Sequence, residues 1–171
     1  MRARGPGAGY PARVSAASDY PTTLPRKRMA AGVLFTDAAG RALLVEPVYK
    51  NDWEIVGGCV EENESPRQAA VREVKEELGR ALAPGRLLVV DWVPPRPGRS
   101  DGVMFVFDGG TLDEQTTAGF HLPPEELRSW AWCSQEQIGE RTSELLTRRV
   151  TAALRAKAEG TMFDLENGFD V

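Results

Sequence analysis

The sequence has 171 residues, of which 42% are hydrophobic and 27% charged, a composition that excludes collagen-like and wholly disordered chains. It contains one histidine and two cysteines, too few for a four-ligand Cys/His zinc site or a disulfide framework, and its net charge of −4 is the wrong sign for a general nucleic-acid binder. No apolar run approaches the roughly 18 residues needed to cross a bilayer, and no apolar segment follows the basic start of the chain. A cytoplasmic protein without membrane or specific nucleic-acid partners is therefore expected.

Three segments are expected along the chain. Residues 1–28 contain six basic residues and one acidic residue, with many glycines and prolines and no helix or strand periodicity. This pattern predicts a flexible basic N-terminal arm over residues 1–25. A folded domain is expected over residues 26–160 and a C-terminal tail over residues 161–171. A basic arm suits an anionic partner or a neighbouring subunit, so a homodimer is one assembly to consider.

Within the domain, short apolar and β-rich runs alternate with turn residues and predict several strands. Helical spacing and good helix starts predict a helix over 65–78, a helix start at Ser134 and a helix over 143–158. Many strands, with one helix between them and helices at the end, predict an α/β fold in which helices pack on the faces of a mixed sheet. The expected strands are 29–35, 41–47, 53–56, 86–93, 103–107 and 127–133.

The segment from Gly58 to Gly79 concentrates acidic residues on one helix face. Ser65 is a good N-cap for this helix, and Glu73, Glu76 and Glu77 follow at i, i+3 and i+4. Three carboxylates on one face repel each other, and two of them lie in the last turn, where the helix dipole disfavours negative charge. A divalent cation would relieve this repulsion, and carboxylate oxygens suit hard ions such as Mg²⁺ or Mn²⁺.

Taken alone, the acidic stretch would be an ordinary solvated helix face, since glutamate favours surface helices. Its surroundings favour a binding site. Gly57 and Gly58 allow the backbone to approach an ion or phosphate closely. Glu64 precedes Arg72 by eight residues, and an arginine there is suited to pair with a carboxylate and hold the loop against the helix.

The segment resembles the Nudix box, G-x5-E-x7-R-E-U-x-E-E-x-G-U, where U is aliphatic. The pattern Gly58-x5-Glu64-x7-Arg72-Glu73-Val74-x-Glu76-Glu77-x-Gly79 agrees at every defined position except the last, where Arg80 replaces the aliphatic residue. Two loop positions nearby also depart from the usual residues, with Val56 in place of proline and Asn63 in place of glycine. The resemblance implies the MutT-like Nudix fold, an α/β/α sandwich with the box helix and a C-terminal helix on opposite faces of a mixed sheet.

The resemblance also implies an activity. Nudix hydrolases are metal-dependent pyrophosphohydrolases that cleave a nucleoside diphosphate linked to another moiety, such as a nucleoside triphosphate or ADP-ribose, by attack of water on a phosphoryl group. It further implies that Glu73, Glu76, Glu77 and the Gly58 carbonyl bind Mg²⁺ or Mn²⁺. Arg72 and Glu64 would orient these carboxylates, so the catalytic group is expected to include Glu76, Glu73 and Arg72. The candidate general bases are Glu76, Glu114, Glu125 and Glu126.

The substrate is less constrained by the sequence. Aromatic residues outside the box, above all Trp53, Phe105 and Trp132, are candidates for contact with the base, although aromatics at strand spacing are often core residues. No catalytic role is assigned to Cys59 or His121. A nucleotide-sensing or regulatory domain without catalysis is the alternative function. Diphosphate isomerisation is disfavoured because it needs a reactive cysteine and further metal-binding histidines.

Overall fold

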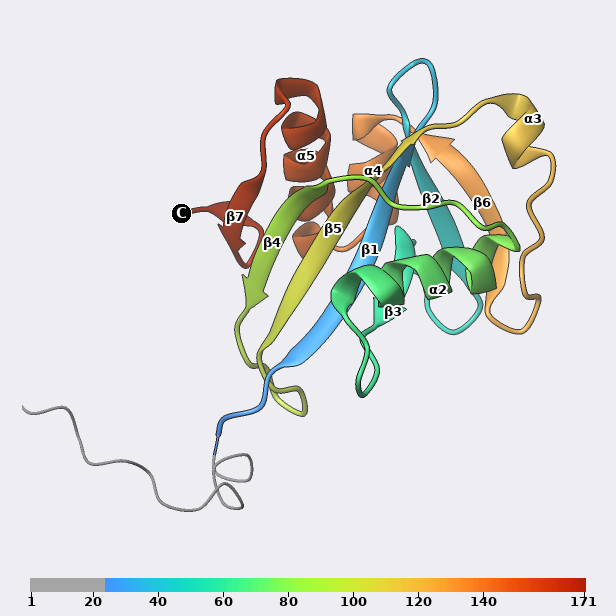
Figure 1. The fold of residues 1–171 in the computed structure, drawn as a ribbon. Helices are drawn as coiled ribbons and strands as arrows, with labels where there is room; N and C mark the ends of the chain where they lie inside the picture. The colour runs from blue at the N-terminus through green and yellow to red at the C-terminus, as the bar shows by residue number, and fades with distance from the viewer. Residues whose placement is uncertain (1–23) are drawn as a thin grey trace, which may run out of the picture.

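The structure is a computed structural model that describes residues 24–171, so the arm expected over residues 1–25 falls almost entirely outside the described residues. Within the described residues, eight strands form one sheet, and helices lie on both sides of it (Figure 1). None of these helices is long and apolar enough to span a membrane. The elements in chain order are β1 (Arg28–Thr36), β2 (Ala42–Pro47), β3 (Val56–Cys59), α2 (Pro66–Leu78), β4 (Leu87–Val93), β5 (Gly102–Thr111), α3 (Glu114–Thr117), β6 (Leu127–Cys133), α4 (Gln135–Arg141), α5 (Glu144–Glu159), β7 (Phe163–Glu166) and β8 (Phe169–Asp170).

Strand β1 is the centre of the sheet. The strand order is β6-β2-β1-β5-β4-β7-β8, with β3 paired to β1 beside the path. β1 runs parallel to β5 on one side. On its other side the first half of β1 pairs with β3, and only its end, at Thr36, meets β2 at Ala42. β1 and β2 therefore separate away from this point, and β3 lies against β1 where they are apart. This pairing places the Gly57-Gly58 backbone against the middle of the sheet.

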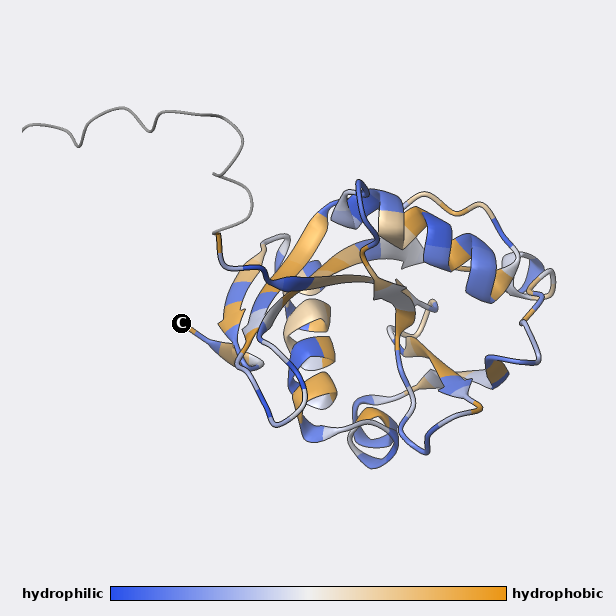
Figure 2. Ribbon diagram, turned by 90° about the horizontal axis from the view of Figure 1, so that it is seen from below, coloured by the Kyte–Doolittle hydropathy of each residue, from blue (hydrophilic) through white to orange (hydrophobic). Residues whose placement is uncertain are grey.

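Two apolar layers cover the sheet. Successive residues of β1 alternate between them, so that Val33 and Phe35 pack with α2 whereas Leu34 packs with α4 and α5. Figure 2 shows α2 and α5 on opposite sides of the sheet. This arrangement confirms the expected α/β/α sandwich built on a mixed sheet.

Helix α2 begins and ends as the sequence predicts. The Ser65 side chain accepts a hydrogen bond from the Gln68 backbone, and the Gln68 side chain accepts one from the Ser65 backbone, which completes a capping box. Gly79 ends the helix in the left-handed conformation, with φ of 66°. Pro66 occupies the first turn. These local signals fix where the helix places the carboxylates of its exposed face.

Residues 161–171, expected to form a tail, instead extend the sheet. β7 pairs in parallel with β4, and β8 turns back against β7. Leu165 in β7 is fully buried. Asn167 and Gly168 both have positive φ, 55° and 81°, and the Asn-Gly pair is the strongest short hairpin signal in a sequence. Apolar and polar residues alternate on both sides of this pair, but of the apolar residues Phe163, Leu165, Phe169 and Val171 only Leu165 is fully buried.

Candidate active site

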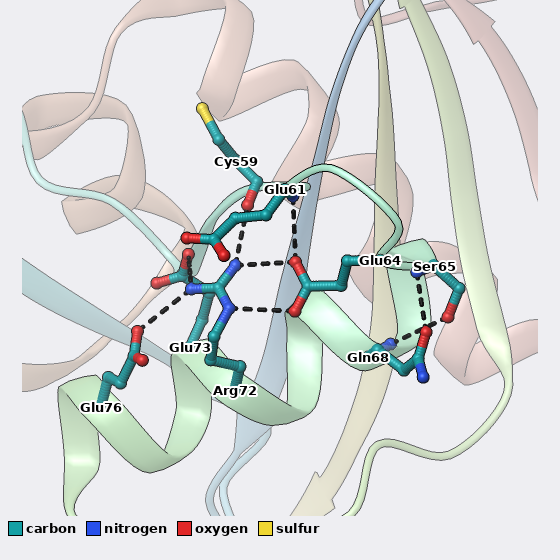
Figure 3. Close-up of polar contacts among 8 residues, drawn as sticks. All are labelled: Cys59, Glu61, Glu64, Ser65, Gln68, Arg72, Glu73 and Glu76. Atoms are coloured by element: carbon teal, nitrogen blue, oxygen red, sulfur yellow. Dashed lines mark hydrogen bonds and ion pairs between the residues drawn. The ribbon is translucent and has the colours of Figure 1, made fainter.

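Arg72 lies at the centre of a polar network between the loop after β3 and helix α2 (Figure 3). Its Nε and Nη2 donate to the two carboxylate oxygens of Glu64, each over 2.9 Å. Nη2 also donates to the Cys59 carbonyl at 2.9 Å, and Nη1 donates to Glu73 at 2.8 Å and to Glu76 at 3.1 Å. The guanidinium lowers the pKa of Glu64 below its ordinary value, chiefly by this hydrogen bonding. Arg72 therefore ties the loop to the helix and fixes the side chains beside it.

Glu73 lies directly against the backbone of Gly58. A Cβ added to Gly58 would be 2.3 Å from Glu73 Oε1, so only glycine leaves room for this carboxylate. Burial raises the pKa of Glu73 above its ordinary value, and the charges of Glu76 and Glu126 add to the rise, although Arg72 opposes it. Glu73 is thus a partly desolvated carboxylate with two further carboxylates near it.

Glu77, one turn further along α2, lies against the preceding glycine. Its Oε2 accepts a hydrogen bond from the Gly57 backbone at 3.0 Å. Gly57 has φ of 146°, and an added Cβ would lie 2.3 Å from the Ala31 carbonyl oxygen, so both conformation and space require glycine. Burial raises the pKa of Glu77 to about 8, and the charges of Glu73 and Glu126 contribute to that value.

Glu76 is the third box carboxylate and the most accessible one. Its side chain is 55% exposed, against 14% for Glu73, and within the described residues it is ion-paired to Arg72. No three Asp, Glu, His or Cys side chains among residues 24–171 already converge as a ligand set. Glu73, Glu76, Glu77 and the Gly58 carbonyl are oxygen donors of the kind that fits a hard divalent cation, and Glu73 and Glu77 are partly desolvated.

A cavity of about 400 Å³ opens beside these groups. Its acidic end is lined by Gly57, Gly58, Glu77 and Glu126, and the cavity continues between the sheet and the start of α5. Four arginines also line it: Arg28 at the start of β1, Arg96 and Arg99 in the turn between β4 and β5, and Arg149 in α5. Glu77 and Glu126 therefore share one cavity with positively charged side chains, an arrangement suited to a polyanionic ligand.

The family model described as the NUDIX domain matches residues 26–154. The chain belongs to the Nudix hydrolase family. A CTP pyrophosphohydrolase of Escherichia coli is 32% identical over 104 residues, which cover 57% of this chain and 70% of that protein. An RNA pyrophosphohydrolase of Hydrogenovibrio crunogenus is 27% identical over 117 residues, which cover 59% of this chain and 70% of that protein.

Solved structures agree at the level of the fold. The MutT protein of Methanosarcina mazei superposes with a TM-score of 0.61 at 22% sequence identity, over 81% of this chain and 99% of that one. At this identity the likeness extends to the Nudix fold and no further. The family match makes the protein an enzyme of a pyrophosphohydrolase family that acts on small nucleotide-like compounds.

Among the candidate general bases, the structure brings Glu126 to the Nudix carboxylates. Glu126 lines the cavity, and its charge raises the pKa values of both Glu73 and Glu77. Glu114 begins the short helix α3, and neither it nor Glu125 lines the cavity. The backbone of Glu126 is anchored to the segment after β2, because its carbonyl accepts a hydrogen bond from the Val48 amide at 2.8 Å.

The predicted aromatic contacts are divided between the cavity and the core. Phe105 is among the cavity-lining residues, although it also packs against the apolar layer beneath α2. Trp53 and Trp132 do not line the cavity. The Trp53 ring lies under the Arg141 guanidinium, 4.5 Å away, and Trp132 packs edge-to-face on Trp130 with 5.8 Å between ring centroids. The two tryptophans therefore pack within the fold.

The two residues without an assigned role have structural positions. The His121 backbone donates to the Leu78 carbonyl at 2.9 Å and covers Gly79, so it packs on the end of α2. Cys59 is exposed, and its carbonyl rather than its thiol contacts Arg72. The cavity arginines were not expected from the sequence, because nothing in the spacing of Arg28, Arg96 and Arg149 along the chain indicates that they meet.

Proposed function

We propose that this Nudix protein is a Mg²⁺-dependent pyrophosphohydrolase of nucleoside diphosphate derivatives, with Mn²⁺ as a second usable ion. The observation that carries the proposal is the position of Glu73 and Glu77. Both carboxylates lie against the Gly57-Gly58 backbone, and Glu77 lines the 400 Å³ cavity, where the raised pKa values reflect mutual repulsion and desolvation. Carboxylates cannot bind a diphosphate without a cation that reverses the local charge.

In this proposal the cation is held by Glu73, Glu76, Glu77 and the Gly58 carbonyl. A bound divalent cation polarises a phosphoryl oxygen and lowers the pKa of bound water. Arg72 positions the ligands: its fork holds Glu64 on one side and its Nη1 reaches Glu73 and Glu76 on the other.

Glu126 is the proposed general base. Its place at the cavity wall and its electrostatic effect on Glu73 and Glu77 support this role over Glu76, whose nearest partner is Arg72. In the step proposed, the oxygen of water bonds to phosphorus while a proton passes to the Glu126 carboxylate. The bond from that phosphorus to the bridging oxygen breaks, and the leaving phosphate retains the electron pair.

The substrate class follows from the chemistry of the cavity. Its acidic end suits the metal-bound diphosphate, and its remaining wall contains both apolar side chains and arginine. A nucleoside triphosphate, ADP-ribose or a similar small nucleotide combines these features. The named relatives act on different compounds, CTP and RNA according to their descriptions, so the individual nucleotide is left to experiment.

A release assay tests the proposal. The purified protein is incubated with nucleoside triphosphates, ADP-ribose, dinucleoside polyphosphates and nucleotide sugars in Mg²⁺ or Mn²⁺, with the Glu77→Gln variant as control. Turnover of at least one compound well above the variant is expected. Wild-type rates equal to the variant on every compound would contradict the enzymatic role. Tight nucleotide binding without turnover would instead favour a sensing domain.

A further inference from the structure

The turn between β4 and β5 places two arginines directly opposite each other. The Arg96 amide donates to the Arg99 carbonyl and the Arg99 amide donates to the Arg96 carbonyl, each over 2.9 Å. Pro97 and Gly98 form the centre of the turn, and Gly98 has φ of 75°, as a type II turn requires. Residues paired in this way extend their side chains to the same face, with Cβ atoms roughly 5 Å apart. Both arginines line the cavity.

Arg28 adds a third guanidinium to this end of the cavity. Its Nε and Nη2 donate to the Ser100 carbonyl at 2.9 and 2.6 Å, so the guanidinium is fixed against the strand that leaves the turn. Arg28 lines the same cavity as the two turn arginines. The neighbouring carboxylate of Asp101 does not neutralise this group, because it is paired with Lys27.

The three arginines keep most of their donors available. Among residues 24–171, none of them is in an ion pair with a carboxylate. The Arg96 side chain makes one long hydrogen bond in this part of the chain, to Asn167 Oδ1 at 3.5 Å. Like charges at directly opposite positions destabilise a strand pair, so the turn itself gains nothing from two arginines. A bound anion would relieve the repulsion, and the planar fork of arginine matches the oxygens of a phosphate.

This basic end of the cavity is separate from the Nudix box. Arg28 precedes Ala31 by three residues, and Ala31 pairs with Gly58, so the two positions lie roughly 10 Å apart along β1. Arg28 pairs with Gly102, and the turn precedes Gly102, so its arginines lie further still from Gly58 along the sheet. A phosphate bound by the arginines would therefore be a different group from the diphosphate at the box. The cavity volume of about 400 Å³ is that of a small-molecule site.

We propose that Arg28, Arg96 and Arg99 form a second phosphate site, which selects nucleotides with a phosphate beyond the diphosphate that is cleaved. The inference rests on the proposed function, because it assigns the other end of the same cavity. The extra group is either a phosphate ester on a ribose or a further member of a longer phosphate chain. With the acidic end for the metal-bound diphosphate and the basic end for the second phosphate, the substrate binds in one direction.

Two pairs of compounds test the inference, and the members of each pair differ in phosphate content. ADP-ribose is compared with its 2′-phosphate ester, and diadenosine diphosphate is compared with diadenosine tetraphosphate. In wild type with Mg²⁺, the phosphate-rich member of at least one pair should have a KM lower by about 10- to 100-fold, the usual effect of charge-assisted hydrogen bonds. The pair that shows the difference identifies the source of the second phosphate, the ribose ester or the longer chain.

The double variant Arg96→Gln/Arg99→Gln should remove most of this difference. Its KM for the phosphate-rich member should rise, while kcat and the KM of the other member stay nearly unchanged. Arg96→Lys/Arg99→Lys keeps the charge but loses the fork, so it should retain part of the preference. Arg41→Gln/Arg155→Gln is the matched control, since it removes the same charge from two arginines that pair with Asp37 and Asp170 and do not line the cavity. That control should keep the wild-type preference.

A preference that persists in the folded Arg96→Gln/Arg99→Gln protein would overturn the inference, as would equal KM values within both pairs in wild type. Either result leaves the proposed hydrolase intact. If wild type turns over none of the compounds, the proposed function fails separately, and calorimetry with the same compounds in Mg²⁺ measures their Kd values. Tighter binding of a phosphate-rich member that is lost in the double variant would support the second site, and equal Kd values within both pairs would overturn it.

Discussion

Arg72 and Glu64 form a two-point ion pair, with Nε donating to Oε1 and Nη2 to Oε2, each over 2.9 Å. The pair joins residues eight positions apart, one in the loop after β3 and one in α2. Its geometry uses the planar fork of arginine, which lysine cannot reproduce. The third nitrogen, Nη1, is thereby aimed at Glu73 and Glu76. The orientation of the proposed metal ligands therefore depends on a residue that is not itself a ligand.

Arg72→Lys should lower kcat/KM by about 10- to 100-fold, the usual effect of losing a group that orients metal ligands. Steady-state kinetics and thermal melts would be measured together. Arg67→Lys is the control, since Arg67 lies on the same helix but donates to the Pro84 and Gly85 carbonyls. That variant should lose stability while keeping kcat/KM. Wild-type kcat/KM in a folded Arg72→Lys protein would show that the fork has no part in the reaction.

Glu77→Gln should lower kcat by roughly a thousandfold, because several kcal/mol of charge stabilisation by the cation would be lost. Mg²⁺ binding, followed by calorimetry, should weaken in parallel. Glu62→Gln is the control, since Glu62 is exposed in the loop before α2. Unchanged Mg²⁺ affinity in the Glu77 variant would remove this residue from the ligand set.

The metal-free protein should lose stability as pH rises from about 5 to 9. The pKa of Glu77 is about 8 in the folded state and 4.5 in its ordinary range, so between these values the folded protein holds a proton that the unfolded chain has released. The penalty for ionising Glu77 is absent below the lower value and complete above the higher one. Melts in EDTA should show a steeper decline for wild type than for Glu77→Gln, and added Mg²⁺ should stabilise wild type at pH 8. The same dependence of melting temperature on pH in wild type and Glu77→Gln would contradict a raised pKa of Glu77 in the folded protein.

Glu126→Gln should lower kcat by roughly 100- to 10,000-fold, because its carboxylate is proposed to accept the proton from water. Glu125→Gln provides a neighbouring control that does not line the cavity. Equal kcat values for Glu126→Gln and Glu125→Gln would show that Glu126 is not the general base. Glu76 would then be the remaining candidate, and kcat of Glu76→Gln would be measured.

Leu165→Ala should destabilise the protein by about 2–4 kcal/mol, as expected for a large core side chain cut back to alanine. Leu165 is fully buried, although it lies in the segment expected to be a tail. Urea denaturation would give the difference in free energy of unfolding. Val171→Ala should change it by no more than about 0.5 kcal/mol, since Val171 is 75% exposed. A Leu165→Ala protein as stable as wild type would show that the packing of β7 does not contribute to the free energy of unfolding.

Local signals explain what could be predicted from the sequence. The cap at Ser65, the proline after it and the glycine at 79 fixed helix α2, and the spacing of Arg72 from Glu64 indicated their pairing. These features depend on residues within one loop and one helix. The nearly continuous apolar run over residues 29–35 likewise identified β1 as a buried strand.

Long-range contacts explain the rest. Trp53 and Trp132 have the aromatic character of a base-binding residue, but periodicity alone does not tell which face of a sheet borders a cavity. Glu126 and Glu125 are equivalent neighbours in the sequence, and only the packing of the preceding loop on Val48 distinguishes them. The Asp91–Arg149 pair joins residues 58 positions apart, and no local pattern in either strand or helix indicates it.

The hydrogen bond from the Gly168 amide to Asp91 has a consequence for synthesis of the chain. The two residues are 77 positions apart, and Gly168 belongs to the turn after β7. A chain growing from its N-terminus exposes the Nudix box early, but Asp91 receives its second partner only after residue 168 has left the ribosome. The end of the cavity beside Glu77 is therefore formed by residues that are translated before Gly168, whereas Asp91 and Arg149 acquire their final arrangement only after residue 168 has been made.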